Sequence, residues 1–192
     1  MHTVLKGGTA HLHARLDALP NIKALMNPRY SSVSYCLALK AYARAHQHIE
    51  QKLINVERFL SLDNLPKYIP RLPSLFHDLS CLAPNDDPQQ YKIYSVTVPI
   101  EAFQMSHYIG LRYVIEGASQ GSKIIARHLE KNLPHLTAQA FSFWKVQLEA
   151  AEQWPIFCEY ISHPAKSTEY GTADAGSCTE SISVFYRMLR LL

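Results

Sequence analysis

Residues 113–127 read Tyr-Val-Ile-Glu-Gly-Ala-Ser-Gln-Gly-Ser-Lys-Ile-Ile-Ala-Arg, and they lie in a proline-free interval between Pro99 and Pro134. Apolar residues recur through this interval at the spacing of one face of a helix. The pattern predicts one long helix, or two helices joined at a bend. Its apolar positions are Phe103, Tyr108, Leu111, Val114, Ile115, Ile124, Ile125 and Leu129.

Two glycines stand on one face of this predicted helix, because Gly117 and Gly121 are four positions apart. With Gly110 they make three of only seven glycines in the chain. A glycine inside a helix costs about 1 kcal/mol relative to alanine, so some benefit should offset that cost. Two structures would profit: a close helix crossing, or a flat ligand lying against bare backbone below a bend. Spacing alone favours the helix crossing.

The segments before this stretch also have helical patterns. Leucines at helical spacing predict a first helix over residues 3–18, which ends because Pro20 disfavours helix at the residue before it. Ser31 or Ser32 can cap the next helix, which we expect to continue through Leu53.

The prolines between residues 61 and 99 indicate a connector that contains a short helix over 74–82, not a second domain. Residues 93–98 are the only strand-like stretch. After Pro134, Thr137 can cap a helix over 141–149. Two more helices are predicted around Trp154, Phe157 and Tyr160, and around Ile182, Phe185, Met188 and Leu189.

Composition agrees with one globular domain over residues 1–192, since hydrophobic residues make up 47% and charged residues 18% of the chain. The 19 lysines and arginines exceed the 16 acidic residues by only three and are scattered, so nucleic-acid binding is not indicated. No apolar run is long enough for a membrane span or a signal peptide. We therefore expect a soluble, cytoplasmic, all-α protein.

Histidine pairs invite a metal interpretation, but His11 and His13 are two positions apart and point to different faces of a helix. At most one of them faces inward. His13 adjoins the leucine stripe and could project into a pocket, although a single histidine at such a position is more often structural. His46, His48 and Glu50 lie in a polar stretch, and we expect their side chains to be solvated.

The segments Thr9-Ala-His-Leu-His13-Ala-Arg-Leu16-Asp17 and Tyr113-Val-Ile-Glu116-Gly117-Ala-Ser-Gln-Gly121 together resemble the bacterial biliverdin-producing heme oxygenases, particularly the phytochrome-associated type. The resemblance implies a single-domain heme oxygenase-like helical fold. It extends over nearly the whole chain, through Tyr35-Cys-Leu-Ala-Leu-Lys40, Arg71-Leu-Pro-Ser-Leu75 with Asp78-Leu79, Trp154 with Phe157, and Phe185.

The resemblance also implies a heme site. His13 would be the proximal ligand of the heme iron, a role that histidine commonly takes. Gly117 and Gly121 would lie over the other heme face, where bare backbone leaves room for iron-bound oxygen. We class these two glycines, with Ser119, as the candidate catalytic residues.

Polar residues of the resembling segments would serve the heme in other ways. Ser119 and Glu116 are candidates to anchor a distal water network. Lys6 lies seven residues, and so about two turns, before His13, and it fits a heme propionate. Tyr113 is a second candidate for that contact. The aspartate that organises distal water in the animal enzymes corresponds to Ala118 here.

The implied activity is the oxidation of heme, which is both cofactor and substrate, to biliverdin, iron and carbon monoxide. Electrons would come from a ferredoxin, a flavodoxin or a reductase, because the chain lacks the G-x-G-x-x-G pattern of a nucleotide-binding site. Two alternatives stay open: a heme-binding protein of the same fold without turnover, and a helical bundle that binds no heme.

Overall fold

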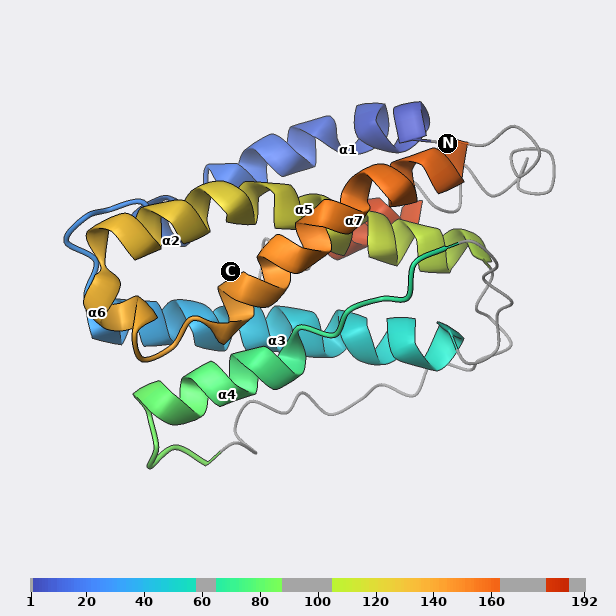
Figure 1. Ribbon diagram of the computed structural model, residues 1–192. Coiled ribbons are helices and arrows are strands. Elements are labelled where there is room, and N and C mark those ends of the chain that lie inside the picture. The colour runs from blue at the N-terminus through green and yellow to red at the C-terminus, as the bar shows by residue number, and fades with distance from the viewer. Residues whose placement is uncertain (1, 58–64, 88–104, 163–178, 187–192) are drawn as a thin grey trace.

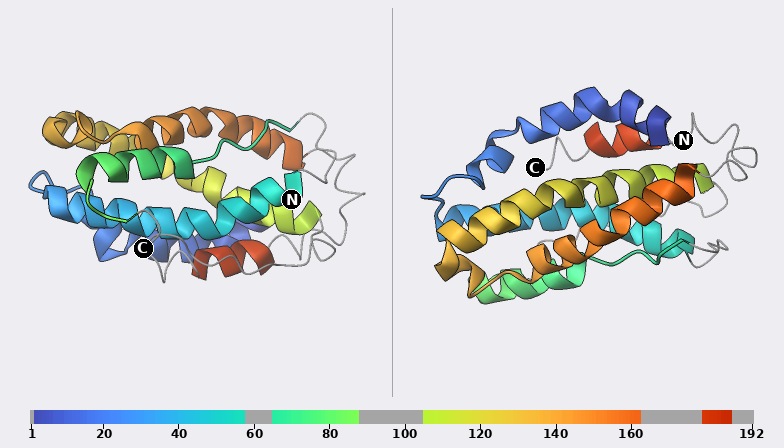
Figure 2. Two further views of the ribbon diagram at one scale, coloured as in Figure 1. Left: turned by 90° about the horizontal axis from the view of Figure 1, so that it is seen from below. Right: turned by 45° about the horizontal axis from the view of Figure 1, so that its top comes forward.

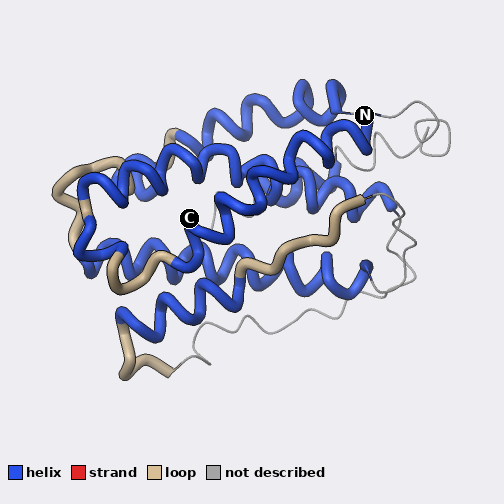
Figure 3. Tube along the Cα trace, in the orientation of Figure 1, coloured by secondary structure: helices blue, strands red, loops and turns tan. Residues whose placement is uncertain are grey.

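The computed structural model describes residues 2–57, 65–87, 105–162 and 179–186, and every regular element in these ranges is a helix (Figure 3). The prediction of an all-α fold is confirmed for this part of the chain. Two predictions fall on residues outside the described ranges: the strand-like stretch 93–98, and the part of the last helix that holds Met188 and Leu189. The helices are α1 (His2–Asp17), α2 (Pro20–Ala24), α3 (Ser32–Glu57), α4 (Leu72–Leu82), α5 (Met105–Asn132), α6 (Pro134–Thr137), α7 (Ser142–Ser162) and residues 179–186.

The long helices form a bundle in which α7 packs along α5, and α4 packs on both α3 and α7 (Figure 1). α1 lies at one edge of the bundle, with the helix 179–186 beside it (Figure 2). One continuous hydrophobic core draws side chains from all of the long helices and from residues 179–186. None of the helices in the described ranges is both long and apolar enough to span a bilayer.

The first two long helices begin and end close to their predicted limits. In α1, buried Leu5, Leu12 and Leu16 form the inner stripe. Thr9 is buried in the same stripe, where its hydroxyl donates a hydrogen bond to the Leu5 carbonyl at 2.7 Å. Ser31 caps α3 by accepting a hydrogen bond from the backbone N–H of residue 34 at 3.1 Å. α3 continues four residues beyond the predicted end at residue 53, to residue 57.

The glycine-bearing stretch belongs to one unbroken helix, α5, so the first of the two predicted arrangements is confirmed. Its glycines do not end it, because buried apolar side chains on both sides of them hold the helix against the core. Pro134 begins the short helix α6, in its first turn, where a missing N–H breaks no helical hydrogen bond.

The prediction for α7 was wrong in two respects. The residues assigned to two helices form one helix, and Thr137 does not cap it, since its hydroxyl donates to the Pro134 carbonyl at 3.1 Å. The cap is the buried Asp78 of α4, whose two carboxylate oxygens accept the N–H groups of Ser142 and Phe143, each at 2.9 Å. A cap supplied from another helix leaves no local signal in the sequence.

α7 continues through Pro155 because another helix replaces the hydrogen bond that proline removes. A residue other than proline at position 155 would donate its N–H to the Ala151 carbonyl. Here the Gln120 side chain of α5 donates to that carbonyl, with its Nε2 at 2.9 Å. This contact joins α5 to α7 beside the glycine-bearing segment.

Candidate functional site

A cavity of about 550 Å³ lies between α1 and α5, and it falls within the range of about 300 to 1,000 Å³ that is usual for ligand pockets. α3, α7 and residues 179–186 contribute its base and sides. The α1 wall includes His2, Lys6, Thr9, Ala10, His13, Ala14 and Asp17, and the α5 wall includes Tyr113, Val114, Gly117, Ala118, Gln120, Gly121, Ser122 and Ile125.

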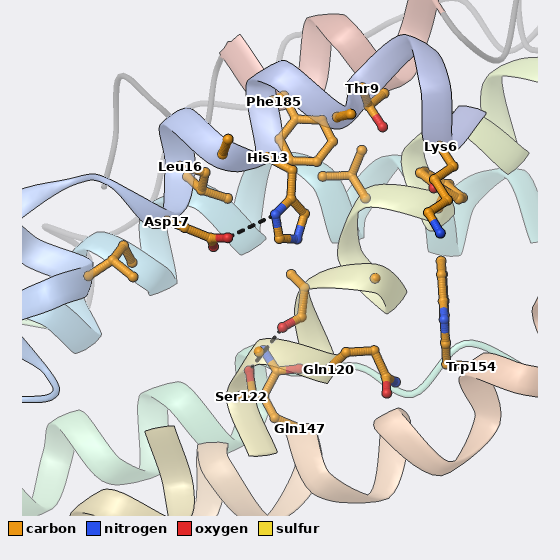
Figure 4. A pocket seen from close by; sticks show the side chains of 18 of the residues that line it. Lys6, Thr9, His13, Leu16, Asp17, Gln120, Ser122, Gln147, Trp154 and Phe185 are labelled. Carbon is orange, nitrogen blue, oxygen red and sulfur yellow. Dashed lines mark hydrogen bonds and ion pairs between the residues drawn. The ribbon is translucent and has the colours of Figure 1, made fainter. Parts of the chain in front are cut away.

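His13 is the histidine of its pair that faces the cavity, as the sequence predicted, whereas His11 is exposed and is not part of the wall. The His13 ring points across the cavity toward α5 (Figure 4). Its Nδ1 lies 2.9 Å from a carboxylate oxygen of Asp17, one turn later on α1, and its ring centroid lies 6.1 Å from that of Phe185. These contacts orient the ring and leave Nε2 available to a ligand.

Gly117 and Gly121 of α5 both line the cavity. A Cβ atom at Gly121 would have no atom within 4 Å, and one at Gly117 would meet only the Trp154 ring at 3.4 Å, an ordinary van der Waals distance. The interpretation of the pair as a close helix crossing was therefore wrong at Gly121, whereas Gly117 lies against the Trp154 ring of α7. Gly121 leaves bare backbone in the α5 wall of the cavity that His13 also lines.

Ser119, a predicted catalytic residue, is not in the cavity wall. It is fully buried, and its hydroxyl donates to the Glu116 carbonyl of the same helix. Two residues correspond to about 200° of rotation around a helix, so a side chain between Gly117 and Gly121 points away from the side they face. Glu116 also points into the core, where it binds Arg71 and Arg112 at 2.6 and 3.1 Å.

Lys6 and Tyr113, the two candidates for propionate contacts, both line the cavity. The Tyr113 ring lies 5.4 Å from the Trp154 ring, and both are about 6 Å from the ring of His2. Figure 4 shows the Lys6 amine above Trp154. Burial and the nearby Lys6 charge lower the pKa of His2. No carboxylate in the described ranges pairs with Lys6, so its charge is available to an anionic ligand.

The sequence interpretation missed two buried polar residues at the base of the cavity, His46 of α3 and Gln147 of α7. The expectation that His46 and Glu50 are solvated was wrong, since they are 2% and 1% exposed; nothing is described of the His48 side chain. A signal was present: position 46 continues the buried stripe 35, 39, 42, 49, 53 at helical spacing.

Glu50 connects the cavity to a buried polar network. Its carboxylate lies 3.3 Å from His46 Nδ1 and accepts hydrogen bonds from the Tyr68 hydroxyl and the N–H groups of Arg71 and Leu72, at 2.6 to 3.1 Å. Burial acts to raise the pKa of Glu50, but the neighbouring His46 and the two N–H donors hold it below its ordinary value. The carboxylate is therefore charged at neutral pH.

The described residues contain no group of three histidine, cysteine, aspartate or glutamate side chains arranged to hold a metal ion. Of the histidines that line the cavity, His13 is the half-exposed one, and a single ligand of this kind suits a metal that brings its other ligands with it, as heme iron does. Comparisons of the chain with protein-family models, curated proteins and solved structures give no match. The residues of the cavity thus carry the functional argument alone.

Proposed function

We propose that the chain is a heme oxygenase, which binds heme in the cavity between α1 and α5 and converts it to biliverdin, iron and carbon monoxide. The observation that carries the proposal is that His13 and the bare backbone of Gly121 line opposite walls of one cavity. A flat ligand between these walls would have an imidazole on one face and open space on the other.

The residues present fit heme. His13 Nε2 would bind the iron, while Asp17 holds Nδ1 and so fixes the ring orientation, as carboxylate partners commonly do for ligating histidines. Gly121 leaves space where any side chain would project into the cavity. Heme, when bound, would supply both the iron that activates oxygen and the porphyrin that is opened.

The remaining contributions of the chain are binding and orientation. Lys6 and Tyr113, which share one end of the cavity, would bind the heme propionates, so that this end fixes how the porphyrin lies. The apolar Val114 and Ile125 would contact its edges and limit the entry of water. Electrons would come from an external ferredoxin, flavodoxin or reductase.

The test is to add hemin to the purified protein, supply a reductant with catalase present, and follow the absorbance of the bilin product. The proposal predicts a histidine-type heme spectrum that decays while biliverdin appears. A heme complex that persists unchanged would identify a heme-binding protein without turnover. Failure to form any complex would identify a helical bundle that does not bind heme.

A further inference from the structure

The base of the cavity holds two buried polar groups that lack ordinary partners. Gln147 Oε1 accepts no hydrogen bond from any described residue, and His46 Nδ1 lies near Glu50 without the alignment of a hydrogen bond. Leaving such a buried atom unpaired costs about 1–3 kcal/mol. Because Nδ1 is turned toward Glu50, Nε2 is the His46 nitrogen available to a group in the cavity. Both residues line the cavity, so a group there can pair with Gln147 Oε1 and reach His46 Nε2.

Helix packing brings these two side chains to the same place. Phe143 lies one turn before Gln147 on α7, and its ring centroid is 5.7 Å from that of His46 and 5.2 Å from that of Tyr42. Tyr42 lies one turn before His46 on α3, so a pair of residues from each helix packs together. Figure 4 shows Gln147 extending from α7 toward Ser122 of α5, in the space between the walls.

We propose that His46 and Gln147 bind one water molecule at the base of the cavity. This water would donate a hydrogen bond to an oxygen atom of the ligand that occupies the cavity. The water would accept a hydrogen bond from His46 Nε2, donate one to Gln147 Oε1 and keep its second proton for the ligand. Three hydrogen bonds are typical of buried water. The inference rests on the proposed function. In the animal enzymes that the chain resembles, an aspartate at the place of Ala118 organises the distal water, and here His46 and Gln147 would hold it.

Glu50 is the charged group nearest to His46, and one of its carboxylate oxygens lies 3.3 Å from Nδ1. The other nitrogen of the ring, Nε2, is therefore the one left to the water.

The other groups around His46 are uncharged or paired with one another. Tyr68 is neutral because burial raises the pKa of its hydroxyl well above the ordinary value. On the cavity side, α1 contributes His13 and Asp17, which pair with each other, and α7 contributes the uncharged Gln147.

The first experiment uses the heme-free protein, so it does not depend on activity. The ring nitrogens of His46 are followed by NMR of protein labelled with ¹⁵N-histidine, in wild type, Gln147→Met and Gln153→Met. Gln153 is a matched control, because it lies on the same helix and its Oε1 is also buried without a partner, but it is not in the cavity wall. We expect Gln147→Met to shift the Nε2 resonance of His46 and Gln153→Met to leave it in place.

An unchanged His46 Nε2 resonance in Gln147→Met would overturn the bound water. Thermal melting followed by circular dichroism checks that each variant folds, and Gln147→Leu replaces the methionine variant if that one does not. The two ring nitrogens separate a water link from a purely structural role, because a general change of packing would shift both, whereas loss of the hydrogen bond to water would shift chiefly Nε2.

The second experiment compares heme affinity and bilin formation in wild type and Gln147→Met. We expect the heme dissociation constant to stay within about twofold and the rate of bilin formation to fall about tenfold or more, as for the loss of a positioned proton donor. An unchanged rate would overturn the donor role even if the NMR shift is present. If wild type binds no heme, the proposed function fails and the donor role with it, while the NMR result still decides whether the water is bound.

Discussion

The bare backbone at Gly121 is the residue-scale feature on which heme binding should depend most. Gly121→Leu would project a side chain into open cavity space, so we expect heme affinity to fall at least about tenfold. The free energy of unfolding should rise by up to about 1 kcal/mol, because a helical glycine is replaced by a good helix former. Heme titration and urea unfolding measure the two effects.

Gly7→Leu is the matched control for that substitution. Gly7 also lies in a helix and a Cβ there also meets nothing within 4 Å, but it is not in the cavity wall. The same gain in stability with unchanged heme affinity is expected. Equal affinities for the Gly121 variant and wild type would contradict the assignment of this wall to the heme.

Single residues of the site were predictable where one helix decides their position. Lys6 and His13 share the cavity side of α1 because seven residues are about two turns. Ser119 was misassigned although the same geometry, applied to the glycines on either side of it, turns it toward the core. His46 was misassigned because the polar residues beside it hid its place in the apolar stripe.

At the scale of elements, the contact between Gln120 and the Ala151 carbonyl makes α7 depend on α5. Gln120→Leu would leave that carbonyl without its donor, and we expect unfolding to become easier by about 1–3 kcal/mol. In a Pro155→Ala background the restored backbone N–H can bind the same carbonyl, so the cost of Gln120→Leu should fall. Urea unfolding of the four proteins of this double-mutant cycle measures the difference. Equal costs in both backgrounds would contradict the replacement.

Element boundaries could be predicted where their signals are local. The α3 cap is Ser31, three residues from the N–H whose hydrogen bond it accepts, and the sequence pattern gave it as one of two candidates with Ser32. The α7 cap is Asp78, 64 residues before Ser142, so no window of sequence around the helix start contains it. The continuation of α7 through Pro155 likewise depends on Gln120 of another helix.

At the scale of the whole molecule, Glu50 of α3 accepts hydrogen bonds from Arg71 and Leu72, where α4 begins. The Arg71 side chain in turn pairs with Glu116 of α5. Its pKa is lower in the folded state than the ordinary value of 4.5. A carboxyl with a lowered folded pKa stabilises the fold above the unfolded pKa, and this stabilisation is lost as pH falls through the folded pKa. We expect Glu50→Gln to cost about 3–5 kcal/mol at pH 7, and the cost to shrink below about pH 4.5.

Urea unfolding across pH tests this dependence, with Glu130→Gln as the control because Glu130 is exposed on α5. The control should differ little from wild type at any pH. A Glu50→Gln cost that does not change between pH 7 and pH 3.5 would contradict a charged Glu50 at the centre of the fold.

The all-α architecture was predictable because helical spacing of apolar residues runs through most of the chain. The cavity was not predictable from that spacing, since α1 and α5 lie far apart in sequence and no pattern within either helix says how far apart they are held. The resemblance supplied the expectation that His13 and the two glycines belong to one site, and the fold brings them to facing walls.

Heme titration of wild type, His13→Ala and His11→Ala, followed in the Soret region, tests the central claim most directly. We predict that wild type and His11→Ala give the same histidine-type spectrum, because His11 is exposed outside the cavity, and that His13→Ala loses it. Imidazole added to the His13 variant should restore the spectrum by occupying the emptied position. A His13→Ala spectrum identical to that of wild type would contradict the assignment of His13 as the iron ligand, and with it the proposed site.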